Sequence, residues 1–263
     1  MIIPPQSRSW MAAIGAQLPL FLTVAYLVPI WAGLRLVQQS LIGDEQAVLS
    51  AIFIFGGAAL LLFLVTFIHE MGHAIAAWSV GHKVHFICVG SWGMSPAQRK
   101  LTRMKNSPDR EYAGFVAQTA RWGGWTKSGA IWVSAGGAAA TALCAALIYG
   151  AAGMTPDIRL GLRVIALAFV IDAVVNLLPL IWGGRSASDG LHILQYLSGY
   201  TPKAEDWAAM RLRYTPADVP LADDAEWAQL SESASPFVAS GPMRDLMQRE
   251  ARRRGDKAVL SRL

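Results

Sequence analysis

The stretch TFIHEMGHAIAAWSVG, Thr66–Gly81, lies at the end of an apolar run that begins near residue 47 and is long enough to cross a membrane. Within five residues it contains two histidines and a glutamate, which are costly in hydrocarbon and usually functional there. His69 and His73 are four positions apart, so on a helix both imidazoles lie on one face. The stretch therefore predicts a membrane helix that carries a polar site.

The composition of the whole chain favours a membrane protein. Hydrophobic residues make up 54% of the 263 residues and charged residues only 16%, whereas soluble domains carry about 25% charged residues. Four segments are long and apolar enough to span a bilayer, namely about 10–34, 47–68, 129–155 and 164–182. The first is too long for a signal-peptide core and is expected to be retained. We therefore expect an all-α polytopic membrane protein with about four transmembrane helices.

Basic residues predict how these helices are oriented. Lysine and arginine are concentrated in the loop between the second and third segments and in the region after the fourth, while the other two connections are short. Basic loops remain in the cytoplasm. Both termini and the HEMGH end of the second helix are therefore expected on the cytoplasmic side of an inner or plasma membrane. The net charge of +5 is then a consequence of topology, and we expect no nucleic-acid partner.

Two regions outside the spans have patterns of their own. Residues 83–88 partly alternate between polar and apolar, with glycines nearby, which predicts a short β-strand or hairpin after the HEMGH helix. Beyond residue 200, PKAEDWAAMRLRY and MRDLMQREARRR predict short amphipathic helices. We divide the chain into a membrane-embedded domain, 1–199, and a small cytoplasmic C-terminal region, 200–263. The residues Gly136–Ala140 are expected to allow close helix packing.

HEMGH, residues 69–73, has the form HExxH, which on a helix is the zinc metalloprotease pattern. The two histidines would bind Zn²⁺, and bound zinc lowers the pKa of its water to about 7. Glu70 lies beside them and would take the proton of that water and pass it to the leaving amine. A catalytic zinc needs a third protein ligand and one open position. The candidates for that ligand are Asp172, Asp189, His82, His85 and His192.

The two aspartates differ in their expected depth. Counting from Leu160 to Trp182 places Asp172 in the middle of the membrane, which is too far from the cytoplasmic depth expected for His69. Asp189 emerges on the same side as His69. In SDGLHILQYL, Asp189 or Ser188 would also cap the start of a helix, and a capping role is compatible with metal binding. His82 and His85 stay open as alternative ligands.

HEMGH (69–73), NLLP (176–179) and SDG (188–190) in combination resemble the site-2 proteases, the intramembrane zinc metalloproteases, over about residues 47–198. The resemblance implies that Zn²⁺ binds His69, His73 and Asp189, that Glu70 is the general base, and that Asn176 binds substrate backbone or an oxyanion. It implies an intramembrane zinc endopeptidase that cleaves a membrane-spanning or membrane-associated protein or peptide in the lipid bilayer.

The chain also departs from the family pattern. Ten positions separate Pro179 from Asp189, which is longer than the family's usual connection, so the position of Asp189 is the main question for the structure. The region Val84–Val89 is a candidate strand edge that would hold an unwound substrate by β-addition, or else a loop at the membrane surface. The alternative function is a non-catalytic membrane scaffold or transport accessory that retains a metal site.

Overall fold

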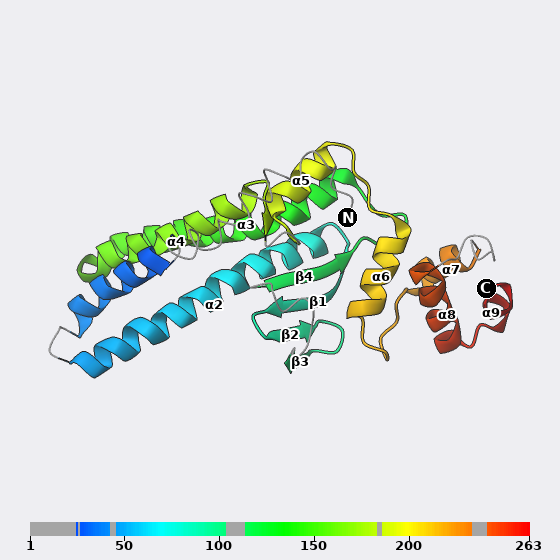
Figure 1. The fold of residues 1–263 in the computed structure, drawn as a ribbon, viewed down its shortest axis with the longest axis horizontal. Helices are drawn as coiled ribbons and strands as arrows, with labels where there is room; N and C mark the ends of the chain where they lie inside the picture. The colour runs from blue at the N-terminus through cyan, green and yellow to red at the C-terminus, as the bar shows by residue number, and fades with distance from the viewer. Residues whose placement is uncertain (1–24, 26, 43–45, 104–113, 183–185, 233–240) are drawn as a thin grey trace. The chain divides into compact units, whose positions relative to one another are not determined.

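The computed structural model describes residues 25, 27–42, 46–103, 114–182, 186–232 and 241–263 (Figure 1). The chain divides into two compact units, each of which combines segments that are far apart in the sequence. Unit 1 comprises Met1–His73 and Ile131–Ser198, and unit 2 comprises Ala74–Ala130 and Gly199–Leu263. Unit 2 therefore joins the C-terminal region beyond residue 199 to the segment that follows HEMGH.

Unit 1 is mainly helical, and four of its helices share one apolar core. Residues 27–41 are helical, and the later helices are α2 (Ala47–Ser79), α3 (Lys127–Ala151), α4 (Arg159–Leu177) and α5 (Asp189–Leu197). Two 3₁₀ turns, Ala152–Met154 and Pro156–Ile158, join α3 to α4. The buried core comes from four of these helices and comprises Ile30, Leu34, Val37, Val65, Ala145, Ile165, Ala168 and Phe169. Burial of these side chains holds α2, α3 and α4 together around the HEMGH turn.

Glycines allow the closest helix contacts in unit 1. A Cβ at Gly72 of α2 would clash with the carbonyl oxygen of Gly136 in α3 and would lie 2.6 Å from Cβ of Ala140. Gly33 and Gly161 also approach each other closely. A Cβ at Gly33 would lie 2.8 Å from the carbonyl oxygen of Gly161, and a Cβ at Gly161 would lie 2.7 Å from the carbonyl oxygen of Gly33. Small residues let helix backbones approach in this way. The predicted packing role of the Gly136–Ala140 segment is therefore confirmed for its two ends.

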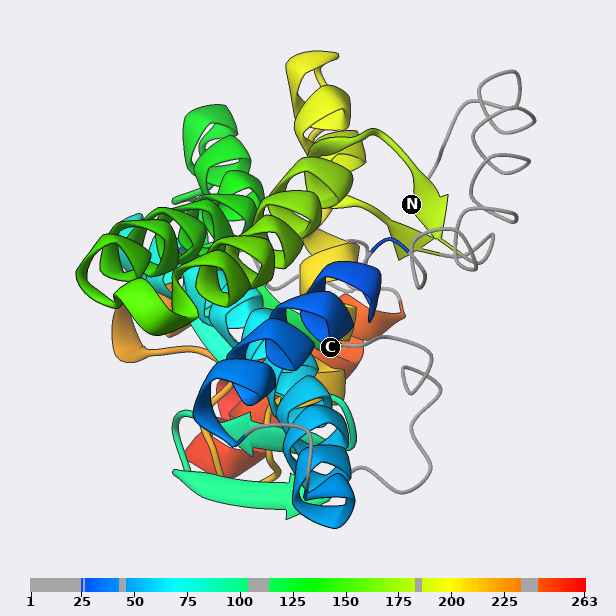
Figure 2. The ribbon, with the colours of Figure 1, turned by 90° about the vertical axis from the view of Figure 1, so that its left-hand side faces the viewer.

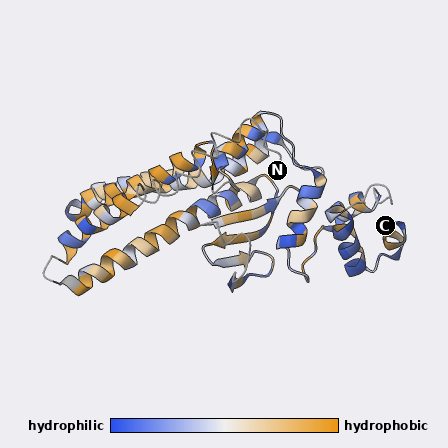
Figure 3. Cartoon of the chain, viewed as in Figure 1, coloured by the Kyte–Doolittle hydropathy of each residue, from blue (hydrophilic) through white to orange (hydrophobic). Residues whose placement is uncertain are grey.

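Three helical segments of the described chain are long and apolar enough to cross a membrane, namely Val48–Ser79, Lys127–Met154 and Pro156–Leu177. Apolar residues dominate α2 along most of its length, whereas α8 (Pro242–Arg254) is strongly hydrophilic (Figure 3). Most of the expected first span, 10–34, lies outside the described residues. The fourth ends at Leu177 instead of near 182, because a proline at 179 disfavours helical geometry at Leu178, whose ψ is 137°.

The predicted fold class, an all-α polytopic membrane protein with about four spanning helices, is wrong. Unit 2 contains a four-stranded antiparallel sheet in the order β3-β2-β1-β4. Its strands are β1 (Lys83–Val89), β2 (Trp92–Ser95), β3 (Lys100–Arg103) and β4 (Gly114–Thr119). We expected only one or two short strands here. The strand β3 escaped prediction because all four of its residues are exposed, so its sequence, KLTR, has no hydrophobic alternation to reveal it.

The strand β1 lies inside the sheet. It pairs with β2 on one side, with Ile87 opposite Met94, and with β4 on the other, with Ile87 opposite Val116. Ile87–Val89 is paired on both sides, so the expectation that this part of the strand holds a substrate by β-addition is wrong. Val84 and Phe86 pair with β4 alone, and for them the expectation stays a prediction. Among the described strands the sheet edges are β3 and β4.

Four helices follow the sheet in unit 2: α6 (Ala204–Tyr214), α7 (Asp224–Glu232), α8 (Pro242–Arg254) and α9 (Lys257–Arg262). The two predicted amphipathic stretches correspond to α6 and α8. The helix α6 packs against β4 and β1 and also against α8. A separate apolar core holds these helices, and it comprises Ala208, Leu221, Ala222, Trp227, Leu230, Met243, Leu246, Met247, Ala251 and Val259.

A buried charged network ties α6 and α7 to the sheet. Arg211 of α6 is only 2% exposed. Its guanidinium donates to Oγ1 of Thr119 at 2.9 Å, to the carbonyl of Ala120 at 2.8 Å and to Oε1 of Glu226 at 2.8 Å. Lys83 of β1 also pairs with Glu226. Because both charges are buried and hydrogen-bonded, this network fixes where α6 packs on the sheet.

Candidate metal centre

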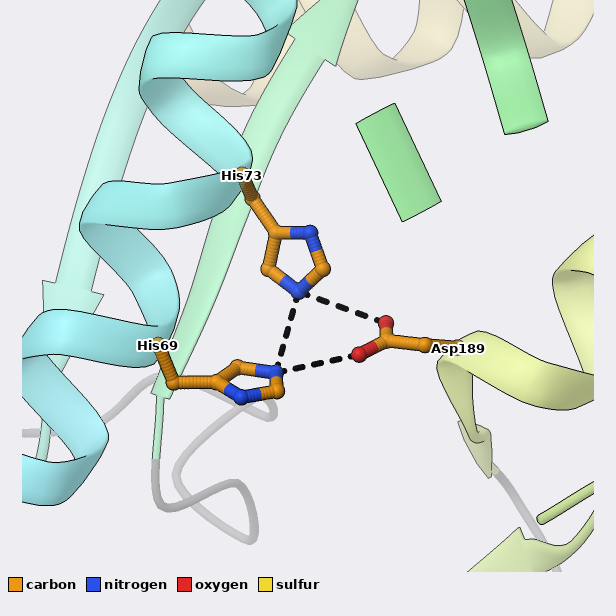
Figure 4. Close-up of side chains that lie close together, drawn as sticks. All are labelled: His69, His73 and Asp189. Carbon is orange, nitrogen blue, oxygen red and sulfur yellow. Dashed lines mark hydrogen bonds and ion pairs between the residues drawn. The ribbon is translucent and has the colours of Figure 1, made fainter. Parts of the chain in front are cut away.

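Two histidines of α2 and one aspartate of α5 meet in unit 1 (Figure 4). The Nε2 atoms of His69 and His73 are 3.1 Å apart. The carboxylate of Asp189 lies 3.0 Å from Nε2 of His69 and 3.3 Å from Nε2 of His73. The three ligand atoms all lie within 4.8 Å of one another. The structure therefore brings together the three residues that the family resemblance implied, and this group could hold a metal ion.

The spacing of these donor atoms fits a small divalent ion. A tetrahedral ion with ligand distances near 2.0–2.2 Å requires its ligand atoms to be roughly 3.3–3.5 Å apart. The separations of 3.1, 3.0 and 3.3 Å are close to that value. Two imidazole nitrogens and one carboxylate also match the donor set of catalytic sites that keep a fourth position open.

The long connection before Asp189 is a hairpin whose base is closed. Its strands are β5 (Ile181–Trp182) and β6 (Ser186–Ala187), which follow α4 and lead into α5 (Figure 2). At its base the N–H of Ser188 donates to the carbonyl of Leu180 at 2.9 Å, and the N–H of Leu180 donates to the hydroxyl of Ser188 at 2.9 Å. The inserted residues therefore leave the path from α4 to Asp189 short.

Ser188 also sets the start of α5. Its hydroxyl accepts the N–H of Leu191 at 3.2 Å as the N-cap and donates to the carbonyl of Leu178 at 2.5 Å. Asp189 is then the first residue of the helix, so of the two predicted caps Ser188 is the one observed. A Cβ at Gly190 would clash with the carbonyl of Leu177. Each residue of the SDG motif thus has a distinct position: Ser188 is a cap, Asp189 belongs to the candidate metal group, and Gly190 closely contacts the end of α4.

The outer nitrogen of each histidine has its own acceptor. Nδ1 of His69 lies 3.0 Å from Oδ2 of Asp172, and Nδ1 of His73 lies 2.7 Å from the carbonyl oxygen of Val133. These contacts leave both Nε2 atoms directed toward Asp189. Metal-binding histidines are usually held in this way by a carboxylate or a backbone carbonyl. Sequence reasoning could not find Val133, because any residue type supplies a carbonyl.

The expected depth of Asp172 was wrong. We placed it too far from His69 by counting a helix from Leu160 to Trp182, but α4 ends at Leu177, so Asp172 is only five residues from its end. The helix α2 continues ten residues beyond His69, to Ser79, as the helical interpretation of Thr66–Gly81 predicted. The earlier end of α4 brings Asp172 to the level of His69. Asp172 contacts the outer nitrogen of a ligand and is not part of the three-ligand group.

The two residues with expected catalytic roles occupy different positions. Glu70 is 7% exposed and lies between His69 and His73 in the sequence of α2. Asn176 is one turn from Asp172 on α4, and its Nδ2 donates to Oδ1 of Asp172 at 3.0 Å and to its carbonyl oxygen at 3.1 Å. Asn176 is therefore connected to His69 through Asp172.

Gly137 of α3 lies directly against the ligand-facing nitrogens. A Cβ built at Gly137 would be 2.5 Å from Nε2 of both His69 and His73. The absence of a side chain at this position leaves the space in which the two imidazoles converge. From the sequence this glycine was assigned to packing, since it stands in a run of small residues that gave no reason to single it out.

The remaining candidate ligands have other partners. His82 is hydrogen-bonded to Gln118, and His85 to Thr119 and Thr215, all within unit 2. His192 follows Asp189 by one turn of α5 and stacks on Tyr196. Burial lowers the pKa of His192, which keeps its imidazole neutral. None of these three belongs to the metal-binding group found among the described residues.

The electrostatics of Asp189 favour its ionised form. Burial alone would raise the pKa of this carboxyl group, but its contacts with His69 and His73 outweigh burial and hold the pKa below its usual range. An ionised carboxylate is the form that binds a metal ion.

Comparison of the chain with protein-family models, with curated proteins and with solved structures finds no match. The likeness to the site-2 proteases therefore rests on the three motifs and on the way their residues are arranged.

Proposed function

We propose that this protein is an intramembrane zinc endopeptidase of the site-2 type. The observation that carries the proposal is the meeting of His69, His73 and Asp189 at separations suited to one tetrahedral ion, with Glu70 buried beside them. A purely structural zinc site takes four protein ligands and needs no base. Three ligands together with an adjacent carboxylate favour catalysis.

Each residue would have a separate task in peptide hydrolysis. His69, His73 and Asp189 hold the ion, and zinc when bound lowers the pKa of its water to about 7. Glu70 accepts the proton of that water and delivers it to the leaving amine nitrogen. The substrate would be a membrane-spanning or membrane-associated protein or peptide, unwound where it is cleaved, because a helix hides its peptide bonds in hydrogen bonds.

The membrane setting is part of the proposal. His69 and His73 belong to Val48–Ser79, the most apolar of the three candidate spans. The concentration of basic residues after this helix and in the C-terminal region supports an orientation with the metal centre toward the cytoplasm. Water would then have a short path to the site.

The test combines metal content with cleavage. Purified wild-type protein and Glu70→Gln should each contain one zinc per chain, whereas His73→Ala should lose it. Membranes from cells that express the wild type should contain new N-termini within a spanning segment, and the uncleaved precursor should accumulate with Glu70→Gln. Thr66→Ala is the matched control, since Thr66 is half-buried one turn before His69 and its hydroxyl bonds only to the carbonyl of Leu62 among the contacts observed.

If cells with Glu70→Gln produce the same new N-termini as the wild type, the protease mechanism is wrong. Retained zinc together with unchanged proteolysis would instead support the alternative of a non-catalytic scaffold or transport accessory.

A further inference from the structure

We propose that Asp172 is a positioning residue for the metal centre and that Asn176 acts through Asp172 instead of on the substrate. The inference rests on the proposed function, because it concerns the residues behind the same ligands. It differs from the role that the family resemblance implied for Asn176.

The side chain of Asp172 is held at both of its oxygens. Oδ2 lies 3.0 Å from Nδ1 of His69, and Oδ1 accepts the Nδ2–H of Asn176 at 3.0 Å. Asn176 also donates to the carbonyl oxygen of Asp172, four residues earlier on α4, which fixes the amide against its own helix. The carboxylate is only 9% exposed. Its orientation is therefore determined by α4, and it in turn determines the orientation of a residue on α2.

This contact assigns the proton on His69. A neutral imidazole has one donor and one acceptor nitrogen, and an ionised carboxylate can only accept. Asp172 therefore keeps the proton of His69 on Nδ1, which leaves the lone pair of Nε2 directed toward the ion. A carboxylate in this position also increases the basicity of the ligand. His73 has the neutral carbonyl of Val133 in the same place, so the carboxylate acts on one ligand only.

The variant Asp172→Asn tests the positioning role with almost no change in volume. Its amide can donate to Nδ1 of His69 and so favour the tautomer in which Nε2 carries the proton. We expect the zinc affinity of the purified full-length protein, measured by competition with a chelator, to fall 10- to 100-fold. The visible spectrum of the Co²⁺-loaded protein should change as well, since it reports on ligand geometry.

The control variant is Ser50→Ala. Ser50 accepts a buried hydrogen bond from Gln38 at 2.9 Å, within unit 1 but outside the metal centre. This substitution removes a buried polar contact of similar kind, so it should lower the midpoint of thermal unfolding and leave zinc affinity unchanged. If Asp172→Asn behaves in the same way, Asp172 merely pairs two helices and the proposal is wrong.

A double-mutant cycle separates the two roles of Asn176. If Asn176 acts through Asp172, Asn176→Leu should weaken zinc binding several-fold, and adding it to Asp172→Asn should have little further effect. If Asn176 instead binds substrate, Asn176→Leu would slow cleavage and leave zinc affinity as in the wild type, which would overturn that half of the proposal.

Metal affinity requires no substrate, so this experiment is independent of protease activity. Weaker zinc binding in Asp172→Asn together with normal cleavage in Glu70→Gln would uphold the positioning role and reject the protease. Unchanged zinc affinity in Asp172→Asn together with loss of cleavage in Glu70→Gln would reject the positioning role alone.

Discussion

Ser188 and Leu180 are joined by two hydrogen bonds, one from the N–H of Leu180 to the hydroxyl of Ser188 and one from the N–H of Ser188 to the carbonyl of Leu180, each 2.9 Å long. These bonds close the base of the β5–β6 hairpin immediately before Asp189. A chain insertion can be accommodated without moving a ligand when its two ends are fixed to each other. The extra residues between Pro179 and Asp189 are accommodated in this way.

Ser188→Ala should therefore weaken metal binding. The substitution removes the N-cap of α5 and the bonds of the hydroxyl to Leu178 and Leu180. Loss of an N-cap typically destabilises a protein by about 1 kcal/mol, and here the freed helix start carries the ligand Asp189. We expect a lower zinc affinity together with a modest fall in thermal stability.

Ser198→Ala is the control. The hydroxyl of Ser198 is exposed at the other end of α5, so this variant should change neither zinc affinity nor thermal stability. Unchanged zinc affinity in Ser188→Ala would mean that the hairpin does not position Asp189.

Gly137→Ala should abolish metal binding while preserving the fold. The added Cβ would lie 2.5 Å from Nε2 of both histidines, in the space that a bound ion and its ligands require. Zinc content of the purified variant, measured by mass spectrometry, should fall to background. Gly150→Ala on the same helix meets no atom within 4 Å, so it should retain zinc and gain up to about 1 kcal/mol of stability, because alanine favours helix over glycine. A zinc-replete Gly137→Ala protein would show that α3 can move away from the imidazoles.

The sequence predicted the grouping of His69, His73 and Asp189 in unit 1 better than the fold of unit 2. The spacing in HEMGH predicts that His69 and His73 lie on one face, because residues four apart on a helix are one turn apart. SDG could be matched to a family motif. The contact between His69 and Asp172 could not be derived, because it depends on where α4 ends, and helix ends are not determined by apolar composition alone.

The sheet of unit 2 illustrates a different limit. Only β1 has a recognisable pattern, and β3 is fully exposed. Lys83, which we counted among the basic topology signals, pairs with the buried Glu226. Basic residues in this region were interpreted as topology signals, which concealed their structural contacts. Arg211 is a similar case, since nothing in the amphipathic pattern of α6 marks it as buried.

Acidification should destabilise unit 2 through His85. This histidine is hydrogen-bonded to Thr119 and Thr215, and burial, assisted by the charges of Arg211 and Lys83, lowers its pKa from 6.5 to about 3. A histidine with a lower pKa in the folded state stabilises the fold fully above pH 6.5, and this contribution is lost as the pH falls from 6.5 toward 3. The slope is at most about 1.4 kcal/mol per pH unit.

Hydrogen exchange of the β1 and β4 amides in the full-length protein, corrected for the intrinsic effect of pH, would measure this loss. His85→Gln removes this titrating group, so the variant should show a shallower profile down to about pH 4.5, with the remaining slope due to His82, whose pKa is also lowered by burial. Below pH 4.5 the fold should lose further stability, because Glu226 then begins to be protonated in the unfolded state. Burial alone would raise the pKa of Glu226, but Arg211 and Lys83 outweigh burial and lower it from 4.5 to about 2. An unchanged slope above pH 4.5 in His85→Gln would assign the effect to another group.

Arg211→Met should release α6 from the sheet. The methionine keeps an apolar chain in the buried position but removes the donors to Thr119, Ala120 and Glu226. Breaking one side of a buried ion pair typically destabilises a protein by about 3–5 kcal/mol, because the remaining charge is left without its partner. Limited proteolysis with mass spectrometry should detect much faster cleavage within residues 199–263.

Arg213→Met on the same helix is the control, since Arg213 is exposed and stacks on Tyr214, and this variant should be cleaved at the wild-type rate. The double variant Arg211→Met/Glu226→Gln removes both buried charges, so it should recover part of the lost protection. If the double variant were cleaved faster than Arg211→Met, the stabilising contribution of Glu226 would come mainly from Lys83 and the backbone of Trp122 instead of from Arg211.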